Sequence, residues 1–330
     1  MTAKRATALL TLSFAWLVLT GCAATPTQQP HDAPMITFGA VADGNRFAEH
    51  APLIVPENPT LGYNRVGRAA ARLDSRQREE IYIDPDDPVY YTRHQQFSTA
   101  RGTFSNLIYR IHFPRVPHRL VPFHITAGRN GGLFVIVTLD PQQRPLLLTT
   151  VHTCGCYLAF VPTSYMPDDA YPDPWPQSQQ RVYGETLPAR LQLPTQWDPA
   201  LRPLIRLREG THRVAAIEFA SIHQVRNQPA FTAVTLEPIS MLHQLPLANG
   251  TTSFFHTEGH RRGYVKNASK PWERMLMGWW TLDINVGVDK RLGDPQETGR
   301  IFYTSLKPWA RQRSNLWHFT DFLSYWGWRL

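Results

Sequence analysis

The chain has 330 residues, of which 28 are proline and 20 are glycine, and its formal net charge is +8 at pH 7. This proline content argues against a bundle of long helices, because proline removes a backbone donor and interrupts helix interiors. Only three cysteines are present, which excludes a fold held together by several disulfide bonds. The length suffices for one large domain or two smaller ones.

The first 21 residues have the three parts of a secretory signal. Lys4 and Arg5 give a short positive start, and an apolar run from Ala8 to Leu19 follows. This run is shorter than the ~20 apolar residues that a permanent membrane-spanning helix needs. We therefore expect residues 1–21 to be a signal peptide, whose removal takes away two positive charges and leaves a formal charge of +6.

The end of this leader, Leu19-Thr20-Gly21-Cys22, resembles the lipobox of bacterial lipoproteins. In that family, small residues precede a cysteine that becomes the lipidated N-terminus. The resemblance covers the leader only, and the alternative is an ordinary cleaved signal with an incidental cysteine. It implies that Cys22 carries acyl chains such as palmitate, more than one of which gives stable anchoring. Because residue 23 is alanine rather than aspartate, it also implies the outer membrane, facing the periplasm, if the source is Gram-negative.

Residues 22–34 are small, polar and proline-bearing, which is typical of a flexible tether. We expect the folded body to span residues 35–330 and to contain no membrane-spanning segment. A basic protein in the cell envelope is expected to contact anionic lipid headgroups or wall polymers. Nucleic acid is not an expected partner in that compartment.

Alternating side chains predict the clearest strands in the middle of the chain. Leu107 to Phe113 is apolar at every second position, whereas Gly132 to Leu139 is apolar on both faces, as in a buried central strand. Asp140 to Pro145 predicts a turn, and Leu146 to Phe160 returns as the second half of an antiparallel hairpin. Further strands are expected in Ile81–Tyr91, broken at Asp84–Pro88, and in Leu120–Thr126, Arg213–Phe219 and Ala230–Leu236.

Helices are expected in a few places. Gly67 to Glu80 is highly charged and predicts a short surface helix. Ser269 could cap a helix that runs to about Leu282, and Ser314 could cap another. Seven of the ten tryptophans lie in this C-terminal part, in the last sixty residues.

These patterns predict an α+β fold, namely a mainly antiparallel β-sheet with a helical, Trp-rich C-terminal part. The segment 161–203 contains nine prolines and little periodicity. It is either a long ordered loop packed over the sheet or a boundary that subdivides residues 35–330.

The residue types with the most chemical interest occur between Thr150 and Tyr157. If this string is extended, His152, Cys154 and Cys156 point to one face, because strand side chains repeat every two residues. Neighbouring strands could add two further histidines, His112 and His124, to that face. Such ligands suit zinc or copper.

A thiol–disulfide pair is the alternative use of Cys154 and Cys156, since two thiols one residue apart tend to be oxidised in an oxidising compartment. Strand geometry would separate their Cα atoms by roughly 6.6 Å, so a disulfide would need bending at Gly155 and would be easily reduced. The remaining alternative is that both cysteines are small apolar side chains in a core strand.

Cysteine-dependent catalysis is a third possibility. Thr153-Cys-Gly-Cys156 is similar to the Ser/Thr-His-Gly-Cys signature of L,D-transpeptidases, and Cys154-Gly-Cys-Tyr157 is similar to a stretch of papain-like enzymes. Both resemblances imply a hydrolase or transpeptidase with a cysteine nucleophile. The chain departs from the first pattern at Cys154 and Leu158, and it lacks one residue of the second, which puts both in doubt.

A non-catalytic function is the competing hypothesis. The tryptophans of the C-terminal part, together with Arg311, Arg313 and Arg329, would suit a membrane interface with anionic headgroups. Such a surface could also bind a wall polymer or a protein partner. The sequence therefore leaves two main hypotheses: a His/Cys site for metal or redox chemistry, or a basic aromatic binding surface.

Overall fold

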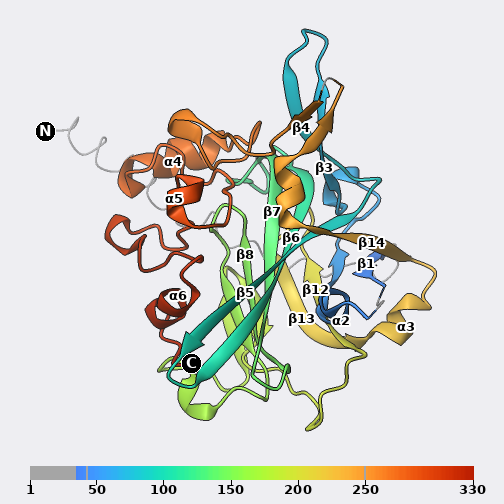
Figure 1. Cartoon of the computed structure of the whole chain (residues 1–330), viewed down its shortest axis with the longest axis vertical. Coiled ribbons are helices and arrows are strands. Elements are labelled where there is room, and N and C mark those ends of the chain that lie inside the picture. Colours follow the sequence, from blue (N-terminus) through green and yellow to red (C-terminus); the bar gives the residue numbers. More distant parts are fainter. Residues whose placement is uncertain (1–34, 42–43, 249) are drawn as a thin grey trace, which may run out of the picture.

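A mixed ten-stranded sheet dominates the computed structural model (Figure 1). The structure describes residues 35–41, 44–248 and 250–330. The predicted signal peptide (1–21), the lipidation site at Cys22 and the tether (22–34) therefore lie outside the described residues. Within those ranges, none of the helices is both long and apolar enough to span a bilayer.

The strands of the large sheet follow the order β13-β12-β2-β1-β14-β5-β6-β7-β8-β9. Their bounds are β1 Thr37–Ala40, β2 Leu53–Pro56, β5 Val89–Thr99, β6 Gly102–Val116, β7 Gly128–Leu139, β8 Pro145–His152, β9 Ala159–Pro162, β12 Leu201–Leu207, β13 Val214–Ser221 and β14 Phe231–Pro238. Three two-stranded sheets join β3 Arg68–Leu73 to β4 Glu79–Asp84, β10 Gln179–Val182 to β11 Glu185–Pro188, and β15 Leu245–Leu247 to β16 Gly250–Thr252.

The helices are short. The α-helices are α2 Arg46–His50, α3 Ile222–Arg226, α4 Pro271–Thr281, α5 Pro295–Thr298 and α6 Phe319–Tyr325. The 3-10 turns are η1 Gly62–Asn64, η2 Asp168–Ala170, η3 Ile239–His243, η4 Gly259–Arg261 and η5 Pro308–Ala310. The last helices of the chain lie together along one side of the sheet (Figure 1).

The α+β class is confirmed, but the sheet is less antiparallel than expected. The run from β5 to β9 is antiparallel throughout. The pairs β1–β14, β2–β12 and β5–β14 are parallel. Strand β14 lies between β1 and β5 although it comes more than a hundred residues after either. Periodicity reveals that a segment is a strand, but it does not reveal the partner that a distant segment finds.

The predicted central hairpin is confirmed, with β7 paired to β8 so that Leu133 lies opposite His152. The break at residues 84–88 also separates two strands, β4 and β5. Strands β13 and β14 cover most of the two later predicted runs. The segment 161–203 contains η2 and the β10–β11 hairpin, and its Met166 and Leu187 are buried in the core.

Three local predictions were wrong. The expected helix at 67–80 is the β3–β4 hairpin, whose turn is closed where the Asp74 carboxylate accepts the Arg76 and Arg78 amides. The segment 120–126 forms only an isolated bridge, between Leu120 and Phe123, rather than a strand. The tail helix α6 begins at Phe319 and not at Ser314.

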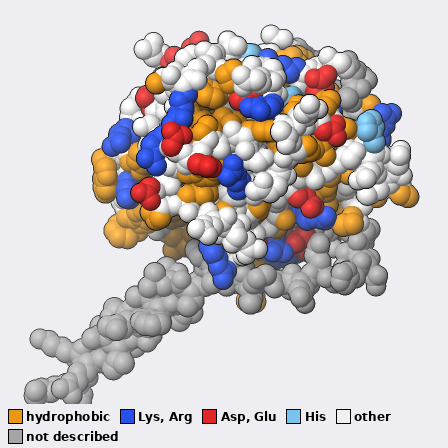
Figure 2. Space-filling view, turned by 90° about the horizontal axis from the view of Figure 1, so that it is seen from below, with side chains coloured by type: hydrophobic (Ala, Val, Ile, Leu, Met, Phe, Trp, Pro, Cys, Tyr) orange, Lys and Arg blue, Asp and Glu red, His pale blue; other side chains and the backbone are white. Residues whose placement is uncertain are grey.

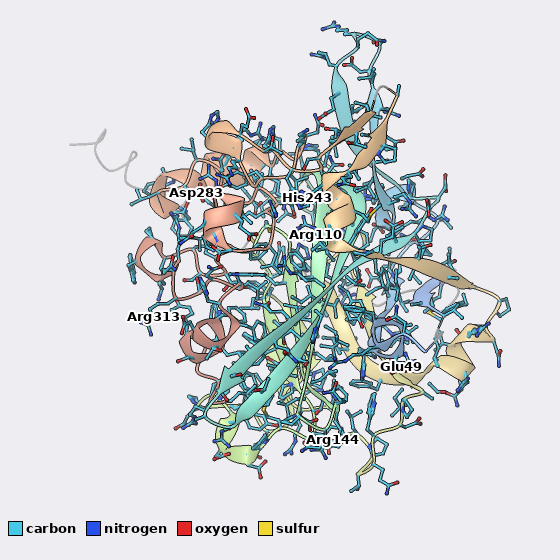
Figure 3. The ribbon with its side chains drawn as sticks, in the orientation of Figure 1. Glu49, Arg110, Arg144, His243, Asp283 and Arg313 are labelled. Carbon is cyan, nitrogen blue, oxygen red and sulfur yellow. The ribbon has the colours of Figure 1, made fainter. Side chains whose placement is uncertain are left out.

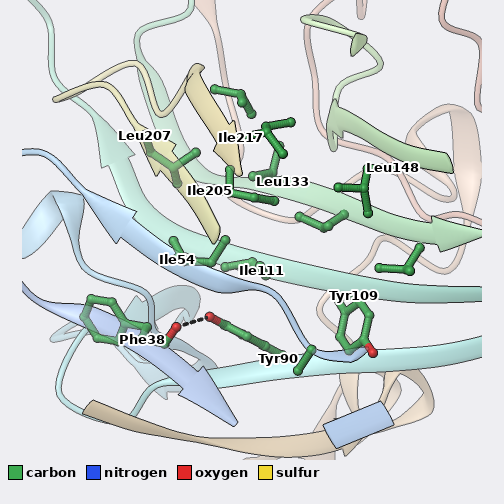
Figure 4. Close-up of a cluster of buried hydrophobic side chains, with 14 of the residues drawn as sticks. Phe38, Ile54, Tyr90, Tyr109, Ile111, Leu133, Leu148, Ile205, Leu207 and Ile217 are labelled. Carbon is green, nitrogen blue, oxygen red and sulfur yellow. Dashed lines mark hydrogen bonds between the residues drawn. The ribbon is translucent and has the colours of Figure 1, made fainter. Parts of the chain in front are cut away.

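The principal core lies on one face of the sheet, where apolar side chains of β6, β7 and β8 meet those of β1, β2, β12 and β13 (Figure 4). The Tyr90 hydroxyl crosses this core and donates to the Phe38 carbonyl at 3.0 Å. On the other face, Phe134 and Leu147 pack against Phe322 and Trp328 of the C-terminal part. The tail is thus partly structural, because it covers the second face of β7 and β8.

Candidate functional site

The string with His152 and the two cysteines is not extended. Strand β8 ends at His152, and the chain turns back so that Gly155 donates to the His152 carbonyl at 2.7 Å. A second bond, from the His152 amide to the Cys156 carbonyl at 2.9 Å, closes the turn. Gly155 has φ 94°, and a Cβ there would lie 2.2 Å from the Tyr303 carbonyl oxygen, so only glycine fits.

This turn brings the two sulfur atoms to the same place. The Cys156 amide donates to Cys154 Sγ at 3.4 Å, a contact that strand geometry would not allow. Both cysteines are free; Cys154 is 1% exposed, whereas Cys156 is only half-buried. Of the two residues, Cys156 is therefore the less deeply buried.

A buried ion pair stands beside the turn. Lys270 Nζ, at the N-terminus of α4, lies 3.2 Å from Asp289 Oδ2, and the two side chains are 4% and 0% exposed. The Thr153 hydroxyl donates to the other oxygen of Asp289. Burial lowers the pKa of Lys270, but the Asp289 and Cys154 charges outweigh it, so the pKa lies well above the usual value. Lys270 is therefore a fixed positive charge.

Lys290 ties the same turn to the chain that follows the ion pair. Its ammonium donates to the Cys154 carbonyl at 2.5 Å, and its amide donates to the Thr153 carbonyl at 2.8 Å. The Lys290 ammonium also lies 4.3 Å from the ring centroid of Tyr303. Burial lowers the pKa of Lys290. Together these contacts hold the turn against the segment 289–290.

Glu273, in the first turn of α4, is the acid nearest to the Cys156 sulfur. The Cys156 thiol donates to Glu273 Oε1 at 3.7 Å, and this side chain is 2% exposed. Burial raises the pKa of Glu273, so the carboxyl holds its proton more readily than an exposed glutamate does. A Cβ at Gly287 would lie 2.0 Å from Oε2, so only glycine leaves room for the carboxyl here.

The two thiols have opposite electrostatic environments. The pKa of Cys154 is lowered, first by the interaction between the two cysteine side chains and then, against the effect of burial, by the Lys270 charge. The pKa of Cys156 is raised well above its usual value by that same interaction, by burial and by the Cys154 charge. The pair thus loses a first proton easily and a second one with difficulty.

His152 does not face the sulfur atoms as a ligand. Its Nε2 lies 3.1 Å from the His212 carbonyl, and burial and the Lys270 charge lower its pKa to about 3. His212 in turn stacks on Phe113, with ring centroids 4.1 Å apart, and its Nε2 lies 3.0 Å from the Tyr63 carbonyl. These two histidines are neutral, buried parts of the core.

The other predicted ligands also have local partners. Nε2 of His112 accepts from Arg110 Nε at 2.9 Å, and His124 Nδ1 lies 3.1 Å from the Pro117 carbonyl. No group of three or more His, Cys, Asp or Glu within the described ranges is placed to hold a metal ion. The structure thus does not gather His112, His124, His152, Cys154 and Cys156 into one zinc or copper site, because the chain leaves the sheet directly after His152.

Sequence reasoning missed four residues of this cluster: Lys270, Glu273, Asp289 and Lys290. They come more than a hundred residues after Cys156, so no local spacing links them to it. The expected helix after Ser269 is present as α4, and it does position Lys270 and Glu273. The sequence of this helix does not indicate that the side chains of Lys270 and Glu273 are buried.

Comparisons with models of known protein families, with curated proteins and with solved structures give no match to this chain.

The buried histidines predict a loss of stability in mild acid. Burial and neighbouring charges lower the pKa of His212 to about 3 in the folded chain, from 6.5. Between these values only the unfolded chain binds the proton, so the free energy of unfolding falls as the pH falls, by about 1.4 kcal/mol per pH unit for one histidine. His212→Gln keeps an amide donor and removes this titration, so the slope of the unfolding free energy between pH 6 and 4, measured by urea unfolding, should fall by about 1.4 kcal/mol per pH unit.

The exposed His223→Gln variant is the matched control for this measurement. It should follow the wild-type dependence on pH. Equal slopes of the unfolding free energy against pH for the wild type and His212→Gln would show that His212 is not held neutral by burial.

Proposed function

We propose that the chain is an envelope lipoprotein, anchored through Cys22, whose Cys154 and Cys156 cycle between two thiols and one disulfide. The observation that carries this proposal is the turn 152–156, which sets both cysteine side chains beside each other, with Cys156 less deeply buried than Cys154. The predicted envelope location supports it further, since disulfides persist there. Thiol–disulfide exchange needs no metal ligands. It is therefore compatible with histidines that do not face the two sulfur atoms.

Exchange begins on the protein disulfide. A substrate thiolate attacks the sulfur of Cys156, the less deeply buried of the two cysteines, and the bond between the two protein sulfurs breaks. Cys154 leaves as a thiolate, which is stabilised by the Cys156 amide and the Lys270 ammonium. The product of this step is a mixed disulfide between the substrate and Cys156.

The second step releases the protein from the mixed disulfide in its dithiol form. A second substrate thiolate attacks the substrate sulfur of the mixed disulfide, and Cys156 leaves with the electron pair and takes up a proton. Glu273 lies next to this sulfur and is placed to supply that proton. Overall, a substrate dithiol becomes a disulfide, and two electrons and two protons pass to Cys154 and Cys156.

The environment of Cys154 favours this direction. A leaving thiol with a low pKa leaves faster, and stabilising the reduced form makes the disulfide a stronger oxidant. Both effects point to a protein that donates its disulfide to other thiols. The buried Lys270–Asp289 pair supplies the fixed charge.

Equilibration with glutathione buffers tests the proposal, with alkylation of free thiols and mass measurement as the readout. The wild type should form an internal disulfide that is reduced reversibly. Lys270→Met should shift the equilibrium toward the disulfide by about tenfold, because the Cys154 thiolate loses about 1.4 kcal/mol of stabilisation. Glu273→Gln should slow the exchange with little change in the equilibrium. Lys307→Met, an exposed lysine, is the control. Failure to form the internal bond, or an equilibrium unchanged in Lys270→Met, would contradict the proposal.

A second candidate function, contact with the membrane surface, is favoured by the outer face of α4. This helix buries its polar Glu273 and Thr281, while Trp279 is 76% exposed and Leu282, directly after the helix, is 74% exposed. Tryptophan favours the interface between lipid and water. The arrangement is the reverse of an ordinary surface helix, which turns its apolar side inward.

Neighbouring segments extend this apolar face at both ends of α4. Near its start, the Phe123 ring lies 5.6 Å from Trp272, next to Val121, which is 91% exposed. Near its end, Arg311 donates to the Thr281 carbonyl, and Trp309 precedes it with 79% exposure. On the face seen in Figure 2, by contrast, charged side chains of both signs are interspersed among apolar ones.

Replacing Cys22 separates membrane attachment through the lipid anchor from attachment through the apolar face of α4. Cys22→Ser should abolish incorporation of labelled palmitate, yet this chain should still co-sediment with vesicles that contain anionic phosphatidylglycerol. Adding Trp279→Ala and Trp280→Ala should reduce that bound fraction by about tenfold, because two large interfacial side chains are lost. Leu61→Ala with Met241→Ala, also exposed, is the control pair. Unchanged binding without the two tryptophans would exclude this face.

A further inference from the structure

A pocket of about 380 Å³ lies between β5, η3 and α5, away from the residues of the thiol turn. Its apolar lining includes Ile239, Phe255 and Leu292, and two arginines, Arg93 and Arg291, also line it. Pockets of this size hold small organic ligands, with apolar walls and a few polar groups that orient them.

The two arginines lack a charged partner, although the Arg93 guanidinium lies over the Trp317 ring, 4.4 Å from its centroid. Both side chains are half-buried, and neither guanidinium makes a hydrogen bond or an ion pair with any residue that the structure describes. Burial and the neighbouring Arg291 charge lower the pKa of Arg93. Glu297 also lines the pocket but is exposed and forms no ion pair with either arginine. Two guanidinium groups therefore line the pocket, and Glu297 is near enough to raise the pKa of both, against the larger effect of burial, without forming an ion pair with either.

A third arginine, Arg110, lies behind the lining residue Phe255 and adds positive charge near the pocket. The Arg110 guanidinium lies 5.1 Å from the ring centroid of Phe255, a lining residue, and its Nη2 has no partner among the described residues. Burial lowers the pKa of Arg110 to about 9, which leaves it charged at neutral pH. His243, which also lines the pocket and is labelled in Figure 3, has its pKa lowered first by burial and then by the charges of Arg291 and Arg110.

We infer that this pocket binds a small anion that has a carboxylate or phosphate head and an apolar body. The planar fork of Arg93 or Arg291 matches the paired oxygens of such a head, and hydrogen bonds between charged groups are about twice as strong as neutral ones. The apolar body would lie against Ile239, Phe255 and Leu292. This binding site shares no residue with the thiol cluster, so it stands independently of the proposed exchange activity.

Calorimetric titration of the mature chain with Cys22→Ser tests this inference without detergent and keeps every described residue. Octanoate and octyl phosphate are the probes, and neutral octanol is the control ligand. Both anions should bind, and octanol should bind at least about tenfold more weakly. Arg93→Gln and Arg291→Gln should each weaken the anions by about tenfold or more, since one charged hydrogen bond is lost.

Arg226→Gln is the matched control variant, because Arg226 is exposed on α3 and far from the pocket lining. Arg291→Lys keeps the charge but loses the planar fork of the guanidinium, so the affinity of this variant for the anions should lie between those of the wild type and of Arg291→Gln. This graded result, together with unchanged thermal unfolding, separates loss of binding from loss of folding.

Dihexanoyl phosphatidylglycerol distinguishes the source of the anionic head: tighter binding than octyl phosphate assigns a lipid headgroup, and weaker binding assigns a free monoester. Octanol binding as tightly as the anions, or unchanged affinity in both Gln variants, would overturn the inference.

Discussion

The buried contact between Lys270 and Asp289 is the interaction on which the thiol site depends. Two charges are costly to remove from water, and breaking such a pair leaves the other charge without compensation. Here the pair joins the start of α4 to the segment before Lys290, and the Thr153 hydroxyl adds the turn of the two cysteines to the same carboxylate. It therefore sets both the shape of the turn and the charge beside Cys154.

The sheet provides the rigid support for this arrangement. Strand β8 runs deep in the core and ends at His152, so the turn begins from a fixed point. The C-terminal part covers one face of β7 and β8 and delivers Lys270, Glu273 and Asp289 to the end of that strand. The same segment then continues into Arg291, so a few residues of chain contribute to both the thiol site and the anion pocket.

Much of the sheet could be predicted from the sequence, because the apolar run from Leu133 to Leu139 in β7 and the leucines at the start of β8 indicate strands that are buried on both faces. The partner of β14 could not, since parallel pairing of distant segments leaves no local pattern. The interest of Cys154 and Cys156 was also visible in the sequence, but their geometry depends on Gly155 at positive φ. One glycine converted an expected strand into a turn, and this change separated the cysteines from the histidines and brought the two sulfurs together.

A titration of the reduced protein by NMR, with ¹³C-labelled cysteine Cβ atoms and Cys22 replaced by serine, tests the central claim most directly. The claim is that the turn and Lys270 activate one of two coupled thiols. The account predicts a first deprotonation below the usual pKa of a cysteine and a second one well above it. Two independent titrations at or above the usual value would contradict it, because the buried ion pair would then have no effect on the dithiol.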